Sequence, residues 1–184
     1  MYRKCVTEVS VRHQKQVEQS LLALMQKMTY EEISVTQLSA EAGISRRVFY
    51  HLFNSKADAL YALIDHTLLD IESYRTELSN QPLRFFLYWR EQKPLLDALG
   101  ANAMTGLLLE RMIESVLRED YDIRYLLKAN GWEEEQEILV FNLSGIMGLV
   151  YSWYYSGYEK SPGEMAVLLE RILTRPLAGG TSAG

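Results

Sequence analysis

The sequence predicts an all-α protein of about nine helices, in which a three-helix N-terminal unit precedes a larger helical domain. Apolar residues recur at steps of three and four over Val17–Met28 and again over Leu60–Ile71, which is the period of amphipathic helices. No alternating apolar and polar run bounded by hairpin-turn dipeptides occurs, so no strand is required. A hydrophobic content of 48% over 184 residues is sufficient for a small domain joined to a larger one.

Start and stop signals define two short helices between those two amphipathic helices. Ser34 and Gln37 form a capping-box pair, which is typical of a helix start. Gly43 is a helix stop, and a second short helix is expected before Phe53.

Signals from residue 82 onward predict the remaining helices. Pro82 is expected to open an aromatic-rich helix, which Pro94 breaks or restarts. A long helix is expected from about Asn102 to Lys128, with Asn130 and Gly131 as its stop. The last two helices are expected over 133–156 and 162–175, the second with Ser161 as its cap and Pro162 in its first turn.

Three parts follow from this order. Residues 1–55 are expected to form a helix-turn-helix domain, residues 56–176 a helical ligand-binding and dimerisation domain, and the Gly-rich residues 177–184 a disordered tail. One cysteine, Cys5, and the lack of an export leader at Met1 favour a cytoplasmic protein without disulfides. Polar residues interrupt the apolar stretch around 138–155, which argues against a membrane span.

The acidic charge is confined to the second part of the chain. The net charge is −5, but residues 1–66 carry +1 and the remainder carries −6. Long-range electrostatics therefore favour presenting the N-terminal third to an anionic partner such as DNA.

The segment 35–56 has the division of residues that a helix-turn-helix requires. Its apolar members can pack inward, and Gly43 permits the left-handed backbone of a tight turn. The residues that remain outside can donate hydrogen bonds to phosphates or base edges. They are Thr36, Ser45, Arg46, Arg47, Tyr50 and His51.

Chemistry and position assign these residues different roles. Arg46 and Arg47 are the expected base readers, since a guanidinium can bind guanine O6 and N7 in a bidentate manner. Tyr50, His51 and Lys56 are expected to contact phosphates. The alternative interpretation is a solvated helix face with no ligand.

The order of these residues resembles the signature of the TetR family of transcriptional regulators. The matching positions are Ala42-Gly43-Ile44-Ser45, then Phe49-Tyr50-His51-Leu52-Phe53, then Ser55-Lys56 and Leu60. The resemblance implies an all-α homodimer that binds operator DNA, most often as a repressor released by a small-molecule effector. By position, Thr36, Arg46, Tyr50, His51 and Lys56 match family DNA-contacting sites. Val48 replaces the usual threonine, and Arg47 replaces a common glycine.

The C-terminal region resembles one subgroup, some members of which are regulators of dihydroxyacetone kinase operons. The matching segments are 145–149, Trp153, Gly157 and 161–166. In the family the last two helices usually form a four-helix dimer interface. The residues suited to such close packing are Gly145, Gly148, Leu168, Leu169 and Ile172; the alternative is that they close the core of a monomer.

Large apolar side chains in the second part predict a pocket for a moderately apolar or aromatic effector. The candidate lining residues are Phe86, Trp89, Met104, Met112, Phe141, Tyr151 and Tyr154, although helical spacing also fits ordinary core.

No catalytic constellation is expected. The three histidines His13, His51 and His66 have no metal-ligand spacing, and no Gly-rich phosphate loop occurs, so neither an enzyme, a metal nor a cofactor is predicted. The competing function is a helical adaptor or coregulator that acts through protein–protein contacts.

Overall fold

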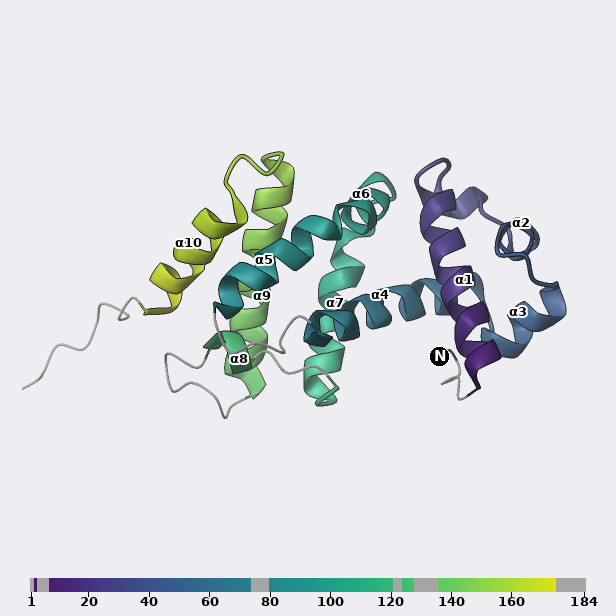
Figure 1. The fold of residues 1–184 in the computed structure, drawn as a ribbon, viewed down its shortest axis with the longest axis horizontal. Coiled ribbons are helices and arrows are strands. Elements are labelled where there is room, and N and C mark those ends of the chain that lie inside the picture. Colours follow the sequence, from purple (N-terminus) through teal and green to yellow (C-terminus); the bar gives the residue numbers. More distant parts are fainter. Residues whose placement is uncertain (1, 3–6, 74–79, 121–123, 128–135, 175–184) are drawn as a thin grey trace, which may run out of the picture. The chain divides into compact units, whose positions relative to one another are not determined.

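The computed structural model describes residues 2, 7–73, 80–120, 124–127 and 136–174. Within these residues the regular secondary structure is helical throughout: nine α-helices of seven or more residues, the one-turn helix α8 and the 3₁₀ helix η1 (Figure 1). The all-α prediction is confirmed. The predicted tail, the predicted stop at 130–131 and residues 133–135 lie outside the described residues.

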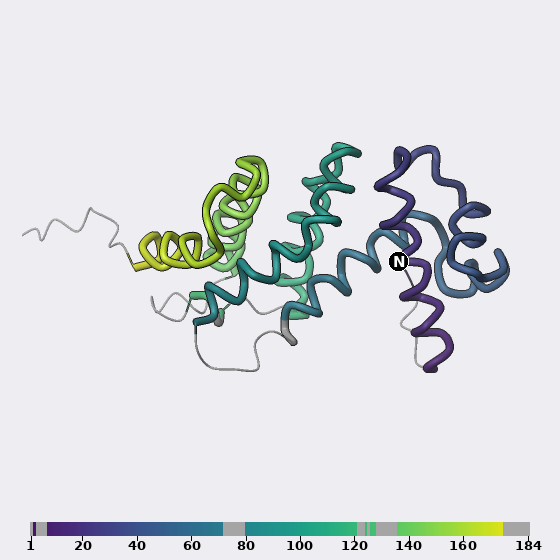
Figure 2. Tube along the Cα trace, turned by 45° about the horizontal axis from the view of Figure 1, so that its top comes forward, coloured from purple at the N-terminus to yellow at the C-terminus, as the bar shows by residue number. Residues whose placement is uncertain are grey.

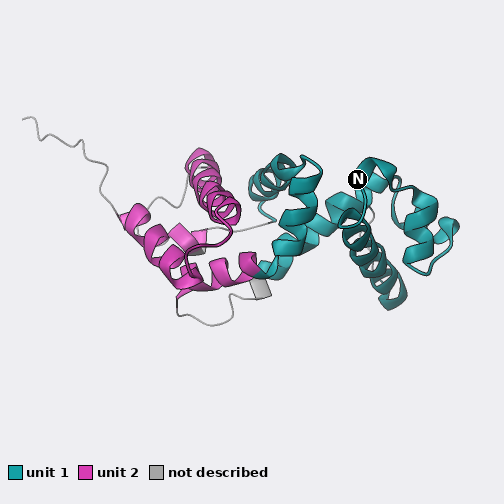
Figure 3. Cartoon of the chain, turned by 90° about the horizontal axis from the view of Figure 1, so that it is seen from above, with its two compact units in different colours: residues 1–73, 91–121 teal, residues 74–90, 122–184 magenta. Residues whose placement is uncertain are grey.

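The chain divides into two compact units (Figure 3). The first comprises residues 1–73 and 91–121, and the second comprises residues 74–90 and 122–184. The predicted boundary after residue 55 subdivides the first unit and stays a prediction.

The first unit holds the N-terminal helices together with two helices from the middle of the chain. They are α1 (Glu8–Met25), η1 (Tyr30–Glu32), α2 (Val35–Glu41), α3 (Arg46–Leu52), α4 (Lys56–Ser73), α6 (Lys93–Ala101) and α7 (Thr105–Leu117). Figure 2 traces these segments from purple to teal along the chain.

The core of the first unit forms where α1 packs against α2 and α4, and where α4 packs against α7. Val17 and Leu21, one turn apart on α1, are fully buried, as are Leu38, Phe49 and Ile64 from three other helices. Each such side chain contributes roughly 1.5–3 kcal/mol when it leaves water. Thr7 starts α1, because its hydroxyl oxygen accepts a hydrogen bond from the Ser10 N–H at 3.2 Å.

The predicted long helix from Asn102 to Lys128 is wrong at both ends. Asn102 caps the end of α6, and α7 ends at Leu117. After α7, Glu119 adopts a positive φ of 60°, and the Asp120 N–H donates to the Ser115 carbonyl at 2.9 Å. This is the closing geometry that glycine usually provides, so the sequence carried no sign of the stop.

The second unit contains the aromatic part of the chain. Its helices are α5 (Gln81–Glu91), α8 (Arg124–Leu127), α9 (Gln136–Tyr155) and α10 (Pro162–Thr174). The last residue of α5, Glu91, is assigned to the first unit. Phe86 meets the Trp153 ring edge-on with centroids 5.5 Å apart, and the indole of Trp153 donates to the Lys160 carbonyl at 2.7 Å. The predicted cap of α10 is confirmed, since Ser161 Oγ accepts from the Glu164 N–H at 3.3 Å.

Helix α9 is long and apolar enough to cross a membrane, in the part of the chain that the structure describes. Ile146, Met147 and Val150 are nevertheless buried within the second unit, as in the core helix of a globular domain. Length and composition are therefore weak evidence for a span.

Two polar contacts hold α4 to its neighbours in the first unit. Arg111 of α7 binds both carboxylate oxygens of Asp65, with its Nε 2.9 Å from Oδ1. His66 Nδ1 lies 2.9 Å from a carboxylate oxygen of Glu18 on α1. Bidentate and charge-assisted hydrogen bonds are the strong ones in proteins, so α4 is fixed to α1 and to α7 at adjacent residues.

The contact between His66 and Glu18 predicts a pH-dependent stability. The hydrogen bond to Glu18 raises the pKa of His66, and the charges of Glu18, Asp65 and Asp70 add to this shift while burial opposes it. Because the pKa is raised in the folded state, the stabilisation is fully present below about pH 6.5 and is lost as the pH rises through the raised value. We expect a loss of about 1 kcal/mol in the free energy of unfolding, measured by urea denaturation across this range.

The matched variant is His66→Gln, which removes the titrating group and keeps a hydrogen-bonding side chain. Its unfolding free energy should change less with pH over the same window. If the stability of this variant changed with pH as much as that of the wild type, another group would be the cause of the dependence.

Candidate nucleic-acid interface

The local sequence fixes α2 and the turn that follows it. The predicted capping box is present, since the Gln37 N–H donates to Ser34 Oγ at 3.2 Å and the Ser34 N–H donates to Gln37 Oε1 at 3.0 Å. Gly43 follows α2 with a φ of +66°. The Ile44 N–H then donates to the Ser39 carbonyl at 3.0 Å, which closes the helix end.

Helix α3 starts directly after this turn. Ser45 Oγ accepts a hydrogen bond from the Val48 N–H at 3.2 Å, so this predicted DNA-binding residue is the cap of α3. Phe49 and Leu52 on α3, and Phe53 after it, are buried. The Phe49 and Phe53 rings lie 5.4 Å apart. Burial of this face determines which side of α3 points outward.

The outward side of α3 presents two polar pairs, each separated by one helical turn. Arg46 and Tyr50 form the first pair, with the Arg46 guanidinium carbon 6.0 Å from the Tyr50 ring centroid. Arg47 and His51 form the second pair. All four side chains are exposed, as is Thr36 at the start of α2. The structure thus leaves these five predicted DNA-contacting residues exposed.

Lys56 has a different environment from the other predicted residues. Its ammonium donates to the backbone carbonyl of Tyr30 and lies 4.1 Å from the centre of the Tyr30 ring. Tyr30 is buried, and burial raises its pKa to about 12. Lys56 therefore ties the start of α4 to η1, and its contact with phosphate stays a prediction.

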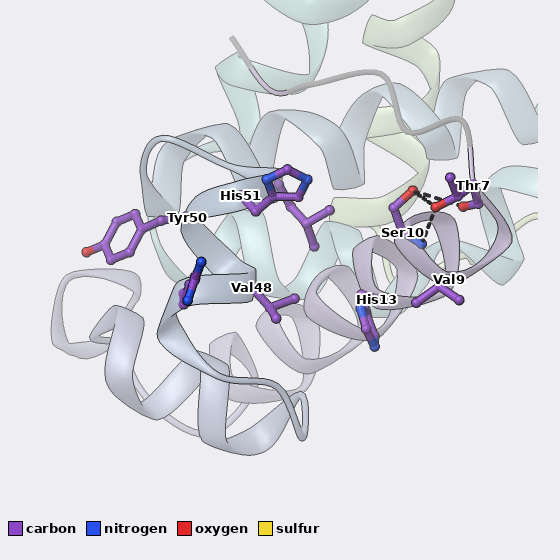
Figure 4. Close-up of a pocket in the computed structure, with 9 residues that line it drawn as sticks. Thr7, Val9, Ser10, His13, Val48, Tyr50 and His51 are labelled. Atoms are coloured by element: carbon purple, nitrogen blue, oxygen red, sulfur yellow. Dashed lines mark hydrogen bonds between the residues drawn. The ribbon is translucent and has the colours of Figure 1, made fainter.

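A groove of about 600 Å³ lies between the first turns of α1 and helix α3 (Figure 4). Thr7, Ser10 and His13 line it from α1, while Arg47, Val48 and His51 line it from α3. Sequence reasoning did not select the α1 residues. The helix cap at Thr7 was the available signal, but nothing in the sequence placed that cap beside α3.

The predicted effector residues are distributed over both units. Met104 and Met112 belong to the first unit and the other five to the second. Phe86, Trp89 and Met112 are fully buried, whereas Phe141 is 76% exposed and so does not line an enclosed cavity of the monomer. Tyr151 and Tyr154 are half-buried.

The predicted dimer residues also separate into two groups. Gly145 and Gly148 lie on the exposed side of α9, and Ile172 of α10 is 49% exposed. Leu168 is half-buried, and Leu169 is buried inside the second unit, which leaves it without a surface for a partner.

The described residues include no group of three or more His, Cys, Asp or Glu side chains that could hold a metal ion. A second pocket is lined by charged side chains, among them Asp65, Arg111 and Glu114. The Arg111 guanidinium binds both carboxylates. The chemistry of this pocket is that of a structural ion network.

Comparison with known proteins supports a regulator fold. No family model and no curated protein matches the chain. Among solved structures it is similar to a TetR-family transcriptional regulator from Streptomyces coelicolor, with 19% identity and a TM-score of 0.56 over 88% of this chain and 78% of that one. It is also similar to the fatty acid degradation regulator FadR from Bacillus halodurans, with 13% identity and a TM-score of 0.51 over 95% of this chain and 99% of that one. The chain thus shares its fold with these two regulators.

The turn between α2 and α3 generates a stability prediction. Gly43→Ala should lower the free energy of unfolding by about 1–2 kcal/mol, because a side chain disfavours the left-handed backbone. A Cβ at this position would meet no atom within 4 Å, so the cost is conformational and not steric. Urea denaturation measures it.

Gly106→Ala is the matched control. Gly106 lies in the first turn of α7, and an added Cβ again meets nothing within 4 Å. We expect unchanged stability or a gain of up to about 1 kcal/mol. Equal losses in the two variants would contradict the role assigned to the backbone of Gly43.

Proposed function

We propose that this protein is a sequence-specific, DNA-binding transcriptional regulator of the TetR type that acts in the cytoplasm as a homodimer. The observation that carries the proposal is the exposed face of α3. Its cap at Ser45 and its buried face fix the helix, while Arg46, Arg47, Tyr50 and His51 remain free of the core. A major groove admits one α-helix, whose early residues contact base edges.

Arg46 has the best position for reading a base. It is the first residue of α3, and its guanidinium lies beside the Tyr50 ring one turn later. Stacking of this kind restricts a long side chain and leaves its donors available for guanine O6 and N7. Thr36 is exposed at the start of α2, and we expect its hydroxyl to contact the DNA backbone.

The exposed side of α9 supports a homodimer. Phe141, Gly145, Gly148, Ser152 and Tyr155 are all exposed and alternate at steps of four and three residues. This spacing forms a straight seam along a helix, and small residues at its centre permit close approach of a second copy.

Gly148→Glu should convert a dimer into monomers in analytical ultracentrifugation, whereas Gly148→Ala should stay dimeric. A dimer in both variants would show that the interface lies elsewhere.

The second unit supports an effector of apolar character. The Trp89 side chain is fully buried, and its indole N–H has no acceptor among the residues that the structure describes. A buried donor without a partner costs about 1–3 kcal/mol, which a ligand with a carbonyl or carboxylate would recover. Such a molecule should release DNA from the wild-type protein and should fail to release it from Trp89→Phe. An effector that releases DNA equally from both proteins would show that Trp89 does not bind it.

Repression and target genes are finer parts of the same proposal. The C-terminal resemblance makes dihydroxyacetone kinase operons one candidate target, and upstream DNA of such an operon can be used as a probe in the binding assay below. Transcription from a bound promoter that rises when the protein is removed would support a repressor, and transcription that falls would contradict it.

A helical adaptor is the second candidate function, favoured by the same apolar side of α9. Phe141 and Tyr155 are 76% and 67% exposed, which a protein partner other than a second copy would also cover. DNA binding separates the two candidates.

The central test is equilibrium binding to fragments of the upstream genomic DNA, measured by fluorescence anisotropy over a salt series. The wild-type protein should bind one fragment more tightly than random DNA, with affinity that falls as salt rises. Arg46→Ala should weaken specific binding by about 1–3 kcal/mol, which is roughly 5- to 150-fold.

Arg90→Ala is the matched control, because Arg90 is an exposed arginine of α5 in the second unit. It should bind as the wild type does. Wild-type affinity no higher for any fragment than for random DNA would instead favour the adaptor.

A further inference from the structure

The two neighbouring arginines of α3 face different surroundings. Arg47 lines the groove shared with α1, together with Tyr50 and His51, and Arg46 does not. Figure 4 shows His51 and Val48 on the side toward α1, while the Tyr50 ring points away from α1. The two arginines are neighbours in sequence, but successive residues on a helix differ in direction by about 100°. Equivalent roles for Arg46 and Arg47 do not follow from their adjacency.

Hydrogen-bond donors line both walls of the groove. Arg47, His13 and His51 contribute nitrogen donors, and Thr7 and Ser10 contribute hydroxyls. Within the described part of the chain, no acidic side chain lines it; Glu8 lies in the first turn of α1 but is not part of the lining. The start of α1 adds the positive end of an 18-residue helix dipole.

Val48 and Leu52 contribute apolar surface to the same groove. A nucleic-acid strand presents both kinds of surface, since its charged phosphates alternate with apolar sugar faces. A small inorganic anion would use only the donors. Tyr50 lines the groove and lies beside Arg46, so a duplex bound at Arg46 would bring a backbone strand to the groove.

We infer that the groove between α1 and α3 binds one sugar-phosphate strand of the DNA, with Arg47 and His13 contacting the phosphates from opposite walls. Arg47 is then a positioning contact and Arg46 the reader of sequence. This inference rests on the proposed function and assigns α1, through His13, a part of the DNA interface. It differs from the expectation that both arginines read bases.

The experiment compares Arg47→Ala, His13→Ala and Arg46→Ala on two probes, a random-sequence duplex and the upstream fragment that the wild type binds. Arg47→Ala should weaken binding to both probes by the same factor and lower the slope of log affinity against log salt by about 1. His13→Ala should also weaken both probes equally. Arg46→Ala should reduce the ratio between the two probes.

Lys27→Ala is the charge-matched control, because Lys27 is exposed beyond the opposite end of α1. Its salt slope should be that of the wild type. A loss equal to that of Arg47→Ala would show a general charge effect and overturn the groove contact.

A scan with single methylphosphonates on the bound fragment locates the contact. Neutralising the phosphate that Arg47 binds should remove the difference between wild type and Arg47→Ala, and the same or an adjacent phosphate should do so for His13→Ala. Phosphates on opposite strands would overturn the groove as the site of one strand.

Failure of this inference is distinguishable from failure of the proposed function. In one outcome the wild type binds specifically, while Arg47→Ala changes the ratio between the two probes and leaves the salt slope unchanged. That result would overturn the groove contact and leave the proposed function standing. Absence of specific binding contradicts the proposed function, and the random-sequence probe then still decides whether Arg47 and His13 contact a phosphate backbone.

Discussion

The arrangement of the candidate interface depends on the burial of Phe49 and Leu52. Helix α3 has seven residues, and isolated helices of that length do not persist in water. Its stability comes from these two side chains and from Phe53, packed into a core that α1 and α2 also supply. The same burial points both polar pairs outward, so packing alone sets the directions of Arg46 and Arg47.

Helix α4 connects this interface to the rest of the first unit. Lys56 at its start binds the Tyr30 carbonyl, and adjacent residues in its middle bind α7 and α1. Arg111 reaches Asp65, while Glu18 reaches His66. Adjacent residues of α4 therefore hold both α7 and α1, the helix that forms one wall of the groove.

Local features were predictable from the sequence where the deciding contacts lie within a few residues. The capping boxes at Ser34 and Ser161, the turn at Gly43 and the buried side of α3 all belong to this class. The stop of α7 was missed because Glu119 adopts a left-handed backbone that its residue type does not announce. The groove was missed because His13 and His51 come together only through the packing of α1 on α3, and the exposure of Phe141 depends in the same way on tertiary contacts.

Selection of duplexes from a randomised DNA library by the protein, followed by sequencing, tests whether α3 reads DNA. Two copies of α3 in a symmetric dimer would read inverted half-sites whose spacing matches multiples of a helical turn, about 34–36 Å. We expect an enriched inverted repeat whose guanine preference disappears with Arg46→Ala. Enrichment of no motif, or of one that Arg46→Ala leaves unchanged, would contradict the claim that α3 reads DNA.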